Sequence, residues 1–557
     1  MGRVKKLDSV KIFLEGQSKI KVTGPYNILK LLLRKVDGLN LLKDKTALRT
    51  KLDELTFYFL KHHLRKMGIT YYTDPKLSEW SYEQTLHNRK IARMKCIDDM
   101  TITIPYSDKL RKYQRVDVAL MQKMKRLILG NEPGTGKTLE SIAYCDLIEA
   151  KKILIVASKS LLGSWASEIE KWSSEPDYKI IPVDTTYKKK EKTNANLNED
   201  HRFNIINYEM LRDRKGFPKL WSTKWDVVIC DEAHRLKGRK SKQTDGASQL
   251  KTDSLILATG TWITNNHHEV FQLLQLLDPK RFTSYWQFVD RFCKTENNYF
   301  NEHAKDIVGT KNMKAYRYMM NPYLIQRKKK DVLTELPPVI HKQIPIEMTA
   351  YQNKHYKELF EDMMTMFENE ELVVSPNVVS KYMRLRQVLL TPALLGGKDS
   401  TNKTDAVLDI IENTDDQIVV FSWFKGYIKH LETILTKKDI SFRSIHGDID
   451  SESRTKAADD FRNGKVKVML GTIKAMSEGL NLQTASTMIF TDKSYVPADN
   501  EQAIARIDRL GQKRSPIIYH LKTVGTVEEM IDETLAKKQD IIDEASAIEE
   551  IIKKLAK

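Results

Sequence analysis

A glycine-rich stretch at residues 131–138, Asn-Glu-Pro-Gly-Thr-Gly-Lys-Thr, combines residue types that can hold a phosphate group. Small residues let backbone N–H groups converge on phosphate oxygens, and here they are Gly134, Thr135 and Gly136. Lys137 would reach the β- and γ-phosphates of a nucleotide, and the Thr138 hydroxyl would bind Mg²⁺. The first residue departs from the general G-x4-G-K-[ST] pattern, and alone the stretch could be a glycine turn beside a surface lysine.

An acidic motif, Asp231-Glu-Ala-His234, supplies the groups that a phosphate-binding loop needs for hydrolysis. Asp231 could hold Mg²⁺, usually through water, and Glu232 could orient and deprotonate an attacking water. Acidic pairs at strand ends are common. The motif gains weight because it follows the glycine-rich stretch by about a hundred residues of sheet-like sequence.

Two arginines could complete such a site from a distant part of the chain. Gln502, Arg506 and Arg509 are spaced four and three residues apart, so a helix would place them on one face. Two guanidinium groups on one face could approach a triphosphate held by another domain. Taken alone, the segment could also be a salt-bridged surface helix.

Short apolar runs that alternate with helical segments predict the elements that position these residues. Parallel α/β sheets show this pattern, and the glycine-rich stretch lies between such a run and a helix N-terminus, where an anion is stabilised. The expected strands lie at 127–129, 153–156, 204–206, 227–229 and 255–257, and in a second region at 418–421, 442–445, 466–470, 488–490 and 517–519. Before them we expect a hairpin at 10–24 and a helix with Leu48, Leu52, Leu55 and Phe59 on one face.

Composition narrows the class of protein. The 557 residues contain 92 Lys and Arg against 74 Asp and Glu, a net charge of +18. This balance suggests a polyanionic partner, most often nucleic acid, although a lysine-rich soluble surface would give it too. Four scattered cysteines argue against a zinc site or a disulfide framework. The sequence shows neither a signal-peptide pattern nor an apolar run of ~18 residues, so no membrane contact is expected.

Further motifs occur in one order along the chain. Over roughly residues 108–535 they resemble the Swi/Snf-type DNA-dependent ATPases of helicase superfamily two, and a compact phage, bacterial or annealing-helicase-like member in particular. The matching stretches are Leu110-Arg-Lys-Tyr-Gln114, the glycine-rich loop, Lys159-Ser-Leu-Leu-Gly-Ser-Trp165, Asp231-Glu-Ala-His-Arg-Leu-Lys237, Thr259-Gly-Thr261, Asp331-Val-Leu-Thr-Glu-Leu-Pro-Pro338, Gly471-Thr472, Glu478-Gly-Leu-Asn-Leu482 and residues 502–512. The family pattern D-E-x-G-x-G-K-T lacks the first glycine as well.

The resemblance implies a role for each site residue. ATP and Mg²⁺ are the implied cofactors. Gln114 would read adenine and Gly479 would contact the nucleotide. Thr138 and Asp231 would hold the metal. The residues implied to contact DNA are Lys159, Ser160, Thr261 and Thr472, and those implied in catalysis are Lys137, Asp231, Glu232, Arg506 and Arg509. The basic run at 327–330 could contact phosphates or pack between lobes.

The predicted fold class is α/β, with two RecA-like parallel-sheet lobes, helical insertions and a small α+β domain before them. The expected units are an N-terminal accessory domain that could recognise the DNA substrate, lobe 1, a helical insertion of lobe 1, a linker with a helical insertion of lobe 2, lobe 2 and a C-terminal helix. Their bounds are 1–105, 106–275, 276–335, 336–400, 401–535 and 536–557.

The expected function is ATP-dependent translocation on double-stranded DNA, with remodelling of forks, repair or recombination intermediates, or protein–DNA complexes. The alternatives are a strand-separating DNA or RNA helicase of the same superfamily and a nucleic-acid-binding scaffold. Double-stranded or branched DNA is the expected partner, and a DNA-bound protein to be displaced is a further candidate. We expect a monomer in the cytoplasm, associated with DNA.

Overall fold

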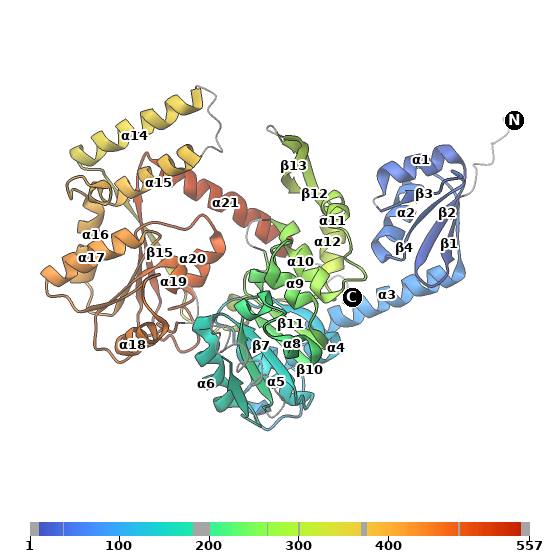
Figure 1. The fold of residues 1–557 in the computed structure, drawn as a ribbon, viewed down its shortest axis with the longest axis horizontal. Coiled ribbons are helices and arrows are strands. Elements are labelled where there is room, and N and C mark those ends of the chain that lie inside the picture. The colour runs from blue at the N-terminus through green and yellow to red at the C-terminus, as the bar shows by residue number, and fades with distance from the viewer. Residues whose placement is uncertain are drawn as a thin grey trace.

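The computed structural model describes residues 10–36, 38–181, 201–263, 266–298, 301–368, 376–476 and 480–546. Two large parallel sheets with helices on both faces form two lobes, and a smaller domain holds the N-terminal residues (Figure 1). The fold class predicted from the sequence is therefore confirmed.

The N-terminal domain has a five-stranded sheet in the order β3-β4-β2-β1-β5. Its strands are β1 (Val10–Glu15), β2 (Lys19–Thr23), β3 (Asn40–Leu41), β4 (Ala47–Lys51) and β5 (Tyr71–Thr73), and its helices are α1 (Tyr26–Lys35), α2 (Glu54–Lys66) and α3 (Pro75–Lys95). The predicted hairpin is confirmed as β1–β2. The predicted helix face is wrong at Leu48, which lies in β4, because Asp53 caps the N-terminus of α2 by accepting from Thr56 N at 2.9 Å.

Lobe 1 contains a seven-stranded parallel sheet in the order β14-β6-β11-β10-β7-β9-β8. Its strands are β6 (Arg126–Leu129), β7 (Ile153–Ala157), β8 (Tyr178–Ile180), β9 (Phe203–Asn207), β10 (Lys224–Asp231), β11 (Lys251–Ala258) and β14 (Leu324–Ile325). The C-terminal parts of β6, β10 and β11 are continuous apolar runs at 127–129, 227–230 and 255–258, and these runs are buried, as strands covered on both faces require. Helices α4 (Lys112–Met124), α5 (Lys137–Leu147) and α6 (Leu162–Trp172) pack over the sheet.

The segment that follows β11 and the short helix α10 (Phe271–Leu277) contains two strands besides the helices that were expected for residues 276–335. Helices α11 (Tyr285–Phe292) and α12 (Met313–Met320) are present, but an antiparallel hairpin of β12 (Cys293–Asn298) and β13 (Asn301–Thr310) lies between them and projects from the lobe (Figure 1). The strand sequence Cys-Lys-Thr-Glu-Asn-Asn has no alternating apolar residues, so its pattern did not indicate a strand.

Lobe 2 contains a six-stranded parallel sheet in the order β15-β20-β19-β16-β18-β17. Its strands are β15 (Ile340–Ile346), β16 (Ile418–Ser422), β17 (Phe442–Ile445), β18 (Val468–Thr472), β19 (Thr487–Phe490) and β20 (Ile517–Thr523). Its helices are α14 (Ala350–Glu368), α15 (Pro376–Leu390), α16 (Asn402–Glu412), α17 (Lys425–Lys437), α18 (Ser451–Arg462), α19 (Ile473–Met476), α20 (Pro497–Ile504) and α21 (Val527–Ser546).

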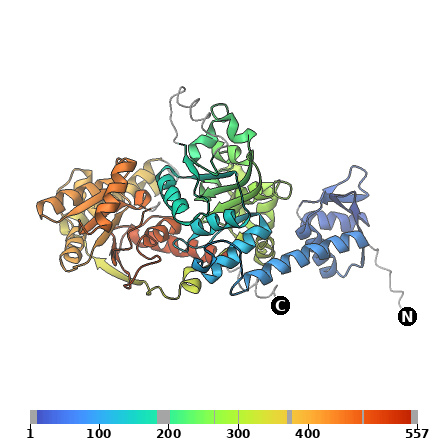
Figure 2. The same cartoon turned by 90° about the horizontal axis from the view of Figure 1, so that it is seen from below.

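Two helices connect the parts of the molecule. Helix α3 runs from the N-terminal domain to lobe 1, as both cartoon views show (Figures 1 and 2). Helix α21 begins at Val527, before the expected residue 536, and leaves lobe 2 to contact α12 of lobe 1. Residues 547–557 of the predicted C-terminal helix lie outside the described part of the chain.

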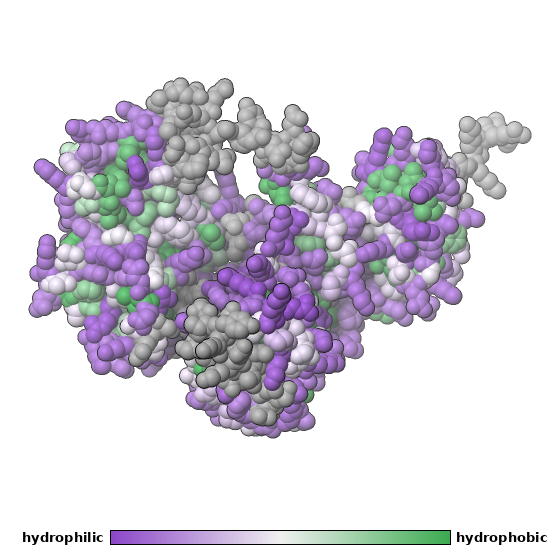
Figure 3. Space-filling model, viewed as in Figure 1, coloured by the Kyte–Doolittle hydropathy of each residue, from purple (hydrophilic) through white to green (hydrophobic). Residues whose placement is uncertain are grey.

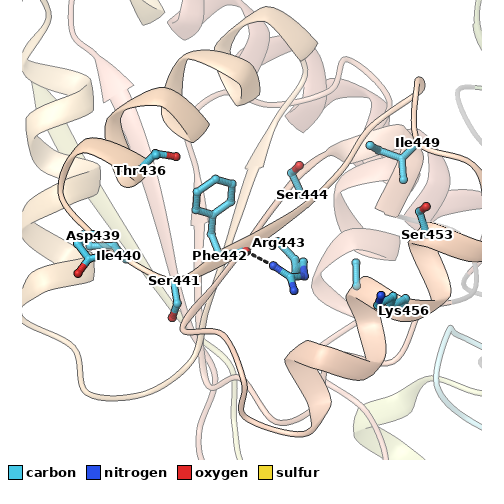
Figure 4. Close-up of a pocket in the computed structure, with 11 residues that line it drawn as sticks. Thr436, Asp439, Ile440, Ser441, Phe442, Arg443, Ser444, Ile449, Ser453 and Lys456 are labelled. Atoms are coloured by element: carbon cyan, nitrogen blue, oxygen red, sulfur yellow. Dashed lines mark hydrogen bonds between the residues drawn. The ribbon is translucent and has the colours of Figure 1, made fainter.

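One face of the described surface shows little continuous apolar area (Figure 3). The face seen in Figure 3 is mostly hydrophilic, with small hydrophobic patches on lobe 2 and on the N-terminal domain. A groove of about 670 Å³ borders the edge strand β17 and helix α18, lined by Phe442, Arg443 and Lys456 among others (Figure 4). None of the predicted site residues lines this groove.

Candidate nucleotide site and nucleic-acid groove

The glycine-rich loop connects β6 to the N-terminus of α5. Gly134 and Gly136 adopt φ values of +86° and +94°, which side chains other than glycine rarely tolerate. Lys137 is the first residue of α5, and its ammonium donates to the carbonyl oxygens of Asn131 at 2.8 Å and Glu132 at 3.3 Å. Thr138 follows in the first helical turn, where the amides and the helix dipole favour an anion.

The Gln114 side chain contacts the loop directly. Its amide nitrogen donates to the carbonyl oxygen of Thr135 at 3.2 Å, and Tyr113 donates its hydroxyl to the same oxygen at 2.6 Å. A Cβ at position 136 would come within 2.5 Å of the Gln114 amide nitrogen, so this close approach requires glycine. The side chain implied to read adenine thus also fixes the loop.

Asn131 lies in a buried polar cluster behind the loop. Its amide nitrogen donates to Asp117 at 2.9 Å and to Glu140 at 3.0 Å. Asp117 also binds Arg327 at 2.7 Å. Burial, then the charge of Asp117, raises the pKa of Glu140 well above its ordinary value. The Asn131 amide thus supplies a donor to each of two buried carboxyl groups, which an aspartate at this position would lack.

The acidic motif stands at the carboxyl end of β10, as the sequence predicts. Asp231 accepts hydrogen bonds from Trp165 Nε1 and from the backbone N–H of Glu232, both at 2.9 Å. Burial and then the adjacent charge of Glu232 raise the pKa of Asp231. Burial lowers the pKa of Lys137, whereas the charges of Glu232 and Asp231 act to raise it, so the two carboxylates lie near enough to Lys137 to interact with it electrostatically.

Glu232 connects to the Thr259-Gly-Thr261 motif through His234. The His234 Nδ1 atom lies 3.2 Å from Glu232 Oε2, 3.3 Å from the Thr261 hydroxyl and 3.4 Å from the Thr259 hydroxyl. Glu232 itself adopts a left-handed φ of +51°. Thr261 is buried, so its hydroxyl contacts the acidic motif and lies away from the lobe surface.

The two arginines reach the site from turns, because α20 ends at Ile504. The prediction that Gln502, Arg506 and Arg509 share one helix face is therefore wrong. The carbonyl of Arg506 accepts from Leu482 N at 3.1 Å, and the carbonyl of Ile507 accepts from the buried Gln512 side chain at 3.1 Å. These bonds replace the amides that a continuing helix would have supplied.

The turns nevertheless bring lobe 2 against the glycine-rich loop. The charge of Arg506 acts on both Lys137 and Glu232. A Cβ at Gly134 would lie 3.4 Å from Arg509 Cβ, so the Arg509 backbone borders the loop. Burial lowers the pKa of the Arg509 guanidinium, and the charge of Glu168 on α6 opposes this shift. Gly479 lies outside the described residues.

A basic groove of about 510 Å³ spans the two lobes near the predicted nucleic-acid contacts. Ser160 of lobe 1 and Thr472 of lobe 2 both line it, and Lys159 is the exposed neighbour of Ser160. The sequence interpretation missed the other polar lining residues. These are Arg235, Lys425, Arg454 and Lys474. Arg235 lies inside the motif at 231–237 and Lys474 lies two residues after Thr472, and these positions were the available signal.

The segment after α12 packs along the glycine-rich loop. The amides of Ile128, Gly130 and Glu132 donate to the carbonyls of Tyr323, Ile325 and Arg327. Lys329 donates its ammonium to Asp508 of lobe 2 at 2.6 Å. Arg327 and Lys329 therefore pack within and between the lobes, which was one of the two alternatives for this basic run.

The residues fit ATP and Mg²⁺. Amides at a helix N-terminus and a lysine suit phosphate, whereas a hydroxyl and a strand-end carboxylate are the hard oxygen donors that Mg²⁺ prefers. Thr138 and Asp231 would hold the metal. Within the described ranges, no group of three or more His, Cys, Asp or Glu side chains is placed to hold a metal ion.

The fold and the site define a two-lobe P-loop nucleoside-triphosphatase. The SNF2-related domain family matches residues 45–394, and the helicase conserved C-terminal domain matches residues 402–511. The chain belongs to the SNF2-related family.

Curated relatives share the core at moderate identity. The CHD3-type chromatin-remodeling factor PICKLE of Arabidopsis thaliana is 27% identical over 75% of this chain and 32% of its own length. Chromodomain-helicase-DNA-binding protein 1-like of Mus musculus is 27% identical over 74% and 47%, and the ISWI chromatin-remodeling complex ATPase ISW2 of Saccharomyces cerevisiae is 28% identical over 78% and 40%. The chain thus spans about a third to a half of these relatives.

Among solved structures, the Sulfolobus solfataricus SWI2/SNF2 ATPase core in complex with dsDNA is 24% identical, with a TM-score of 0.38 over 82% of this chain and 97% of that chain. Within the described residues, no helix is long and apolar enough to cross a membrane.

Proposed function

We propose that this protein is an ATP-dependent translocase on double-stranded DNA that remodels DNA structures or protein–DNA complexes, such as forks and repair or recombination intermediates. One observation carries the proposal. Arg506 of lobe 2 lies close enough to act electrostatically on Lys137 and Glu232 of lobe 1. A group supplied across a cleft makes hydrolysis depend on closure of the lobes.

Each site residue then has a chemical role. Lys137 and Thr138 orient the phosphates, and Asp231 holds the metal through its carboxylate. Glu232, oriented by His234, accepts a proton from the attacking water, and Arg506 stabilises charge that develops on the transferred group. When bound, ATP and Mg²⁺ supply the phosphoryl group and the cation that offsets its charge. Arg509 borders the loop and would complete closure.

The interlobe groove is the proposed DNA track. Its lining combines cationic side chains with the hydroxyls of Ser160 and Thr472 from opposite lobes. Such groups contact backbone phosphates, so the grip would be largely independent of sequence. Thr261, buried against His234, would transmit DNA contact to Glu232. The relatives' names as chromatin-remodeling ATPases support ATP-driven remodelling as the general activity.

The N-terminal domain is proposed to add a second nucleic-acid contact. Residues 1–95 hold 21 Lys and Arg against 9 Asp and Glu, so they carry +12 of the net charge of +18. Tyr58 and Tyr82 are exposed by 53% and 62%. Aromatic rings among cations can stack on unpaired bases.

We propose that the protein acts as a monomer and that it is located with its DNA substrate.

ATPase rates with duplex, forked, four-way and single-stranded DNA and with RNA test this function. Duplex or branched DNA should stimulate ATP turnover most. If single strands or RNA stimulate turnover most, the result favours a strand-separating helicase instead. Lys137→Ala should reduce kcat by roughly 10²-fold or more while DNA binding, measured by fluorescence anisotropy, persists. Undiminished turnover in this variant would refute the assignment, and absent turnover in the wild-type protein would favour a scaffold.

A further inference from the structure

Helix α3 buries one polar face against lobe 1 at its C-terminal end. Asn88, Ile91, Ala92 and Lys95 are buried on this face. The Lys95 ammonium uses all three of its donors, to Asn321 O at 2.5 Å, Asn321 Oδ1 at 3.0 Å and Leu324 O at 2.6 Å. The Asn321 amide nitrogen donates in turn to Asn88 O at 2.9 Å and Asn88 Oδ1 at 3.0 Å.

Lys95 of α3 holds Asn321 and Leu324, which lie just before and within β14, the strand that pairs with β6 ahead of the glycine-rich loop. Residues 321–329, which we call the relay segment, contain β14 and continue as the backbone partner of Ile128, Gly130 and Glu132. A Cβ at Gly130 would come within 2.7 Å of Leu324 Cδ1, so the relay segment packs tightly against the end of β6, where the glycine-rich loop begins. A displacement of the relay segment would therefore displace the loop.

Arg327 of the relay segment connects the C-terminus of α3 to the buried polar cluster behind the glycine-rich loop. Its guanidinium donates to the carbonyl of Lys95 at 3.2 Å and to Asp117 at 2.7 Å and 3.0 Å. Asp117 accepts from Asn131, whose carbonyl accepts from the Lys137 ammonium. A continuous set of hydrogen bonds thus runs from the last residue of α3 to the lysine that would hold the phosphates.

We propose that Lys95 and Arg327 are positioning residues through which the docking of α3 sets the geometry of the phosphate-binding loop. This inference rests on the proposed ATPase function. The N-terminal domain then affects nucleotide binding through α3 in addition to any contact it makes with DNA. Such couplings between sites typically change affinity by roughly 5- to 150-fold.

Lys95→Met tests the proposal because it removes the ammonium and keeps the length of the side chain. Lys90→Met, on the exposed part of the same helix, is the matched control. With duplex DNA at saturation, Lys95→Met should raise the KM for ATP by roughly fivefold or more. The Kd for duplex DNA without nucleotide should stay within about twofold in Lys95→Met, and Lys90→Met should leave the KM for ATP unchanged.

Arg327→Lys should raise the KM in the same direction, and the double variant should be no worse than the stronger single variant, because both act through the relay segment. Asn88→Ala, which keeps the backbone acceptor, gives the same test with a smaller change if Lys95→Met fails to fold. The proposal would be overturned by an unchanged KM for ATP in a folded Lys95→Met or Asn88→Ala variant. It would also be overturned if either variant lost ATP and DNA affinity equally, or if the effects of Lys95→Met and Arg327→Lys were additive. Absent ATPase activity in the wild-type protein would instead refute the proposed function.

Discussion

The two halves of the candidate site differ in how their residues are held. In lobe 1, Lys137, Asp231 and Glu232 stand at the ends of regular elements and interact with neighbours in the same lobe. In lobe 2, Arg506 and Arg509 lie on turns beyond α20, and Arg506 Nη1 donates to the Leu480 carbonyl at a long 3.4 Å. The first half is preorganised, whereas the second half depends on how the lobes meet.

The largest expected effect on kcat comes from the lobe 2 half of the site, whose arginines lie on turns. Arg506→Ala should lower kcat by about 10³-fold or more, because the guanidinium is the charge that lobe 2 presents to Lys137 and Glu232. The KM for ATP should change by only a few-fold, since the loop that binds the nucleotide belongs to lobe 1. Steady-state ATPase assays with duplex DNA measure both values.

Arg514→Ala is the control for this comparison, because Arg514 pairs with Asp416 on the exposed surface of lobe 2. Its kcat should equal that of the wild-type protein. A kcat of Arg506→Ala within tenfold of the wild type would mean that lobe 2 contributes little to hydrolysis and would remove the distinction between the halves.

The preorganised half was also the more predictable from sequence. Apolar runs with flanking turns indicated β6 and β10 because the part of a parallel strand that is buried on both faces is a continuous apolar run, here 127–129 and 227–230. That placed the glycine-rich loop and Asp231 at the carboxyl ends of strands in one sheet. Helical spacing misplaced Arg506 and Arg509, since the distant Leu482 amide and the Gln512 side chain bind the carbonyls of Arg506 and Ile507 in place of helical amides. A local pattern does not contain such contacts.

The same limit applies to Asn131. Its partners Asp117 and Glu140 are near in sequence, but Arg327, which offsets the charge of Asp117, is 210 residues away from it. The family pattern explained that the first glycine is absent. It did not explain why asparagine stands there, which required the buried carboxylates in three dimensions.

An intermediate effect tests this preorganisation. Asn131→Asp replaces the donor shared by Asp117 and Glu140 with a third acceptor in a buried cluster. An unsatisfied buried group costs about 1–3 kcal/mol, so thermal unfolding should shift by about 2–4 °C for each kcal/mol lost from the lobe. The double variant Asn131→Asp/Glu140→Gln returns one amide donor and should recover most of the loss. Equal instability of the two variants would contradict this account of the cluster.

The smallest expected effect concerns the contact that joins the halves. The Lys329 backbone N–H donates to Glu132 of the glycine-rich loop at 2.6 Å, and its ammonium binds Asp508, two residues beyond Arg506, at 2.6 Å. Lys329→Met removes only the second contact. Since such a bond contributes on the order of 1 kcal/mol, kcat should fall about fivefold with little change in the KM for ATP.

Asp508→Asn and the double variant decide whether Lys329 acts through Asp508. If this one pair carries the effect, the double variant should match Lys329→Met, and the exposed Lys330→Met should behave as the wild type. The Lys329 ammonium also donates to the Asp508 carbonyl at 2.7 Å. A loss in Lys329→Met that is independent of the Asp508 carboxylate would therefore assign the effect to this backbone contact between the lobes. A shared loss would mean that lobe 2 positions Arg506 partly through a lysine of lobe 1, and that the division between the halves does not follow the boundary between the lobes.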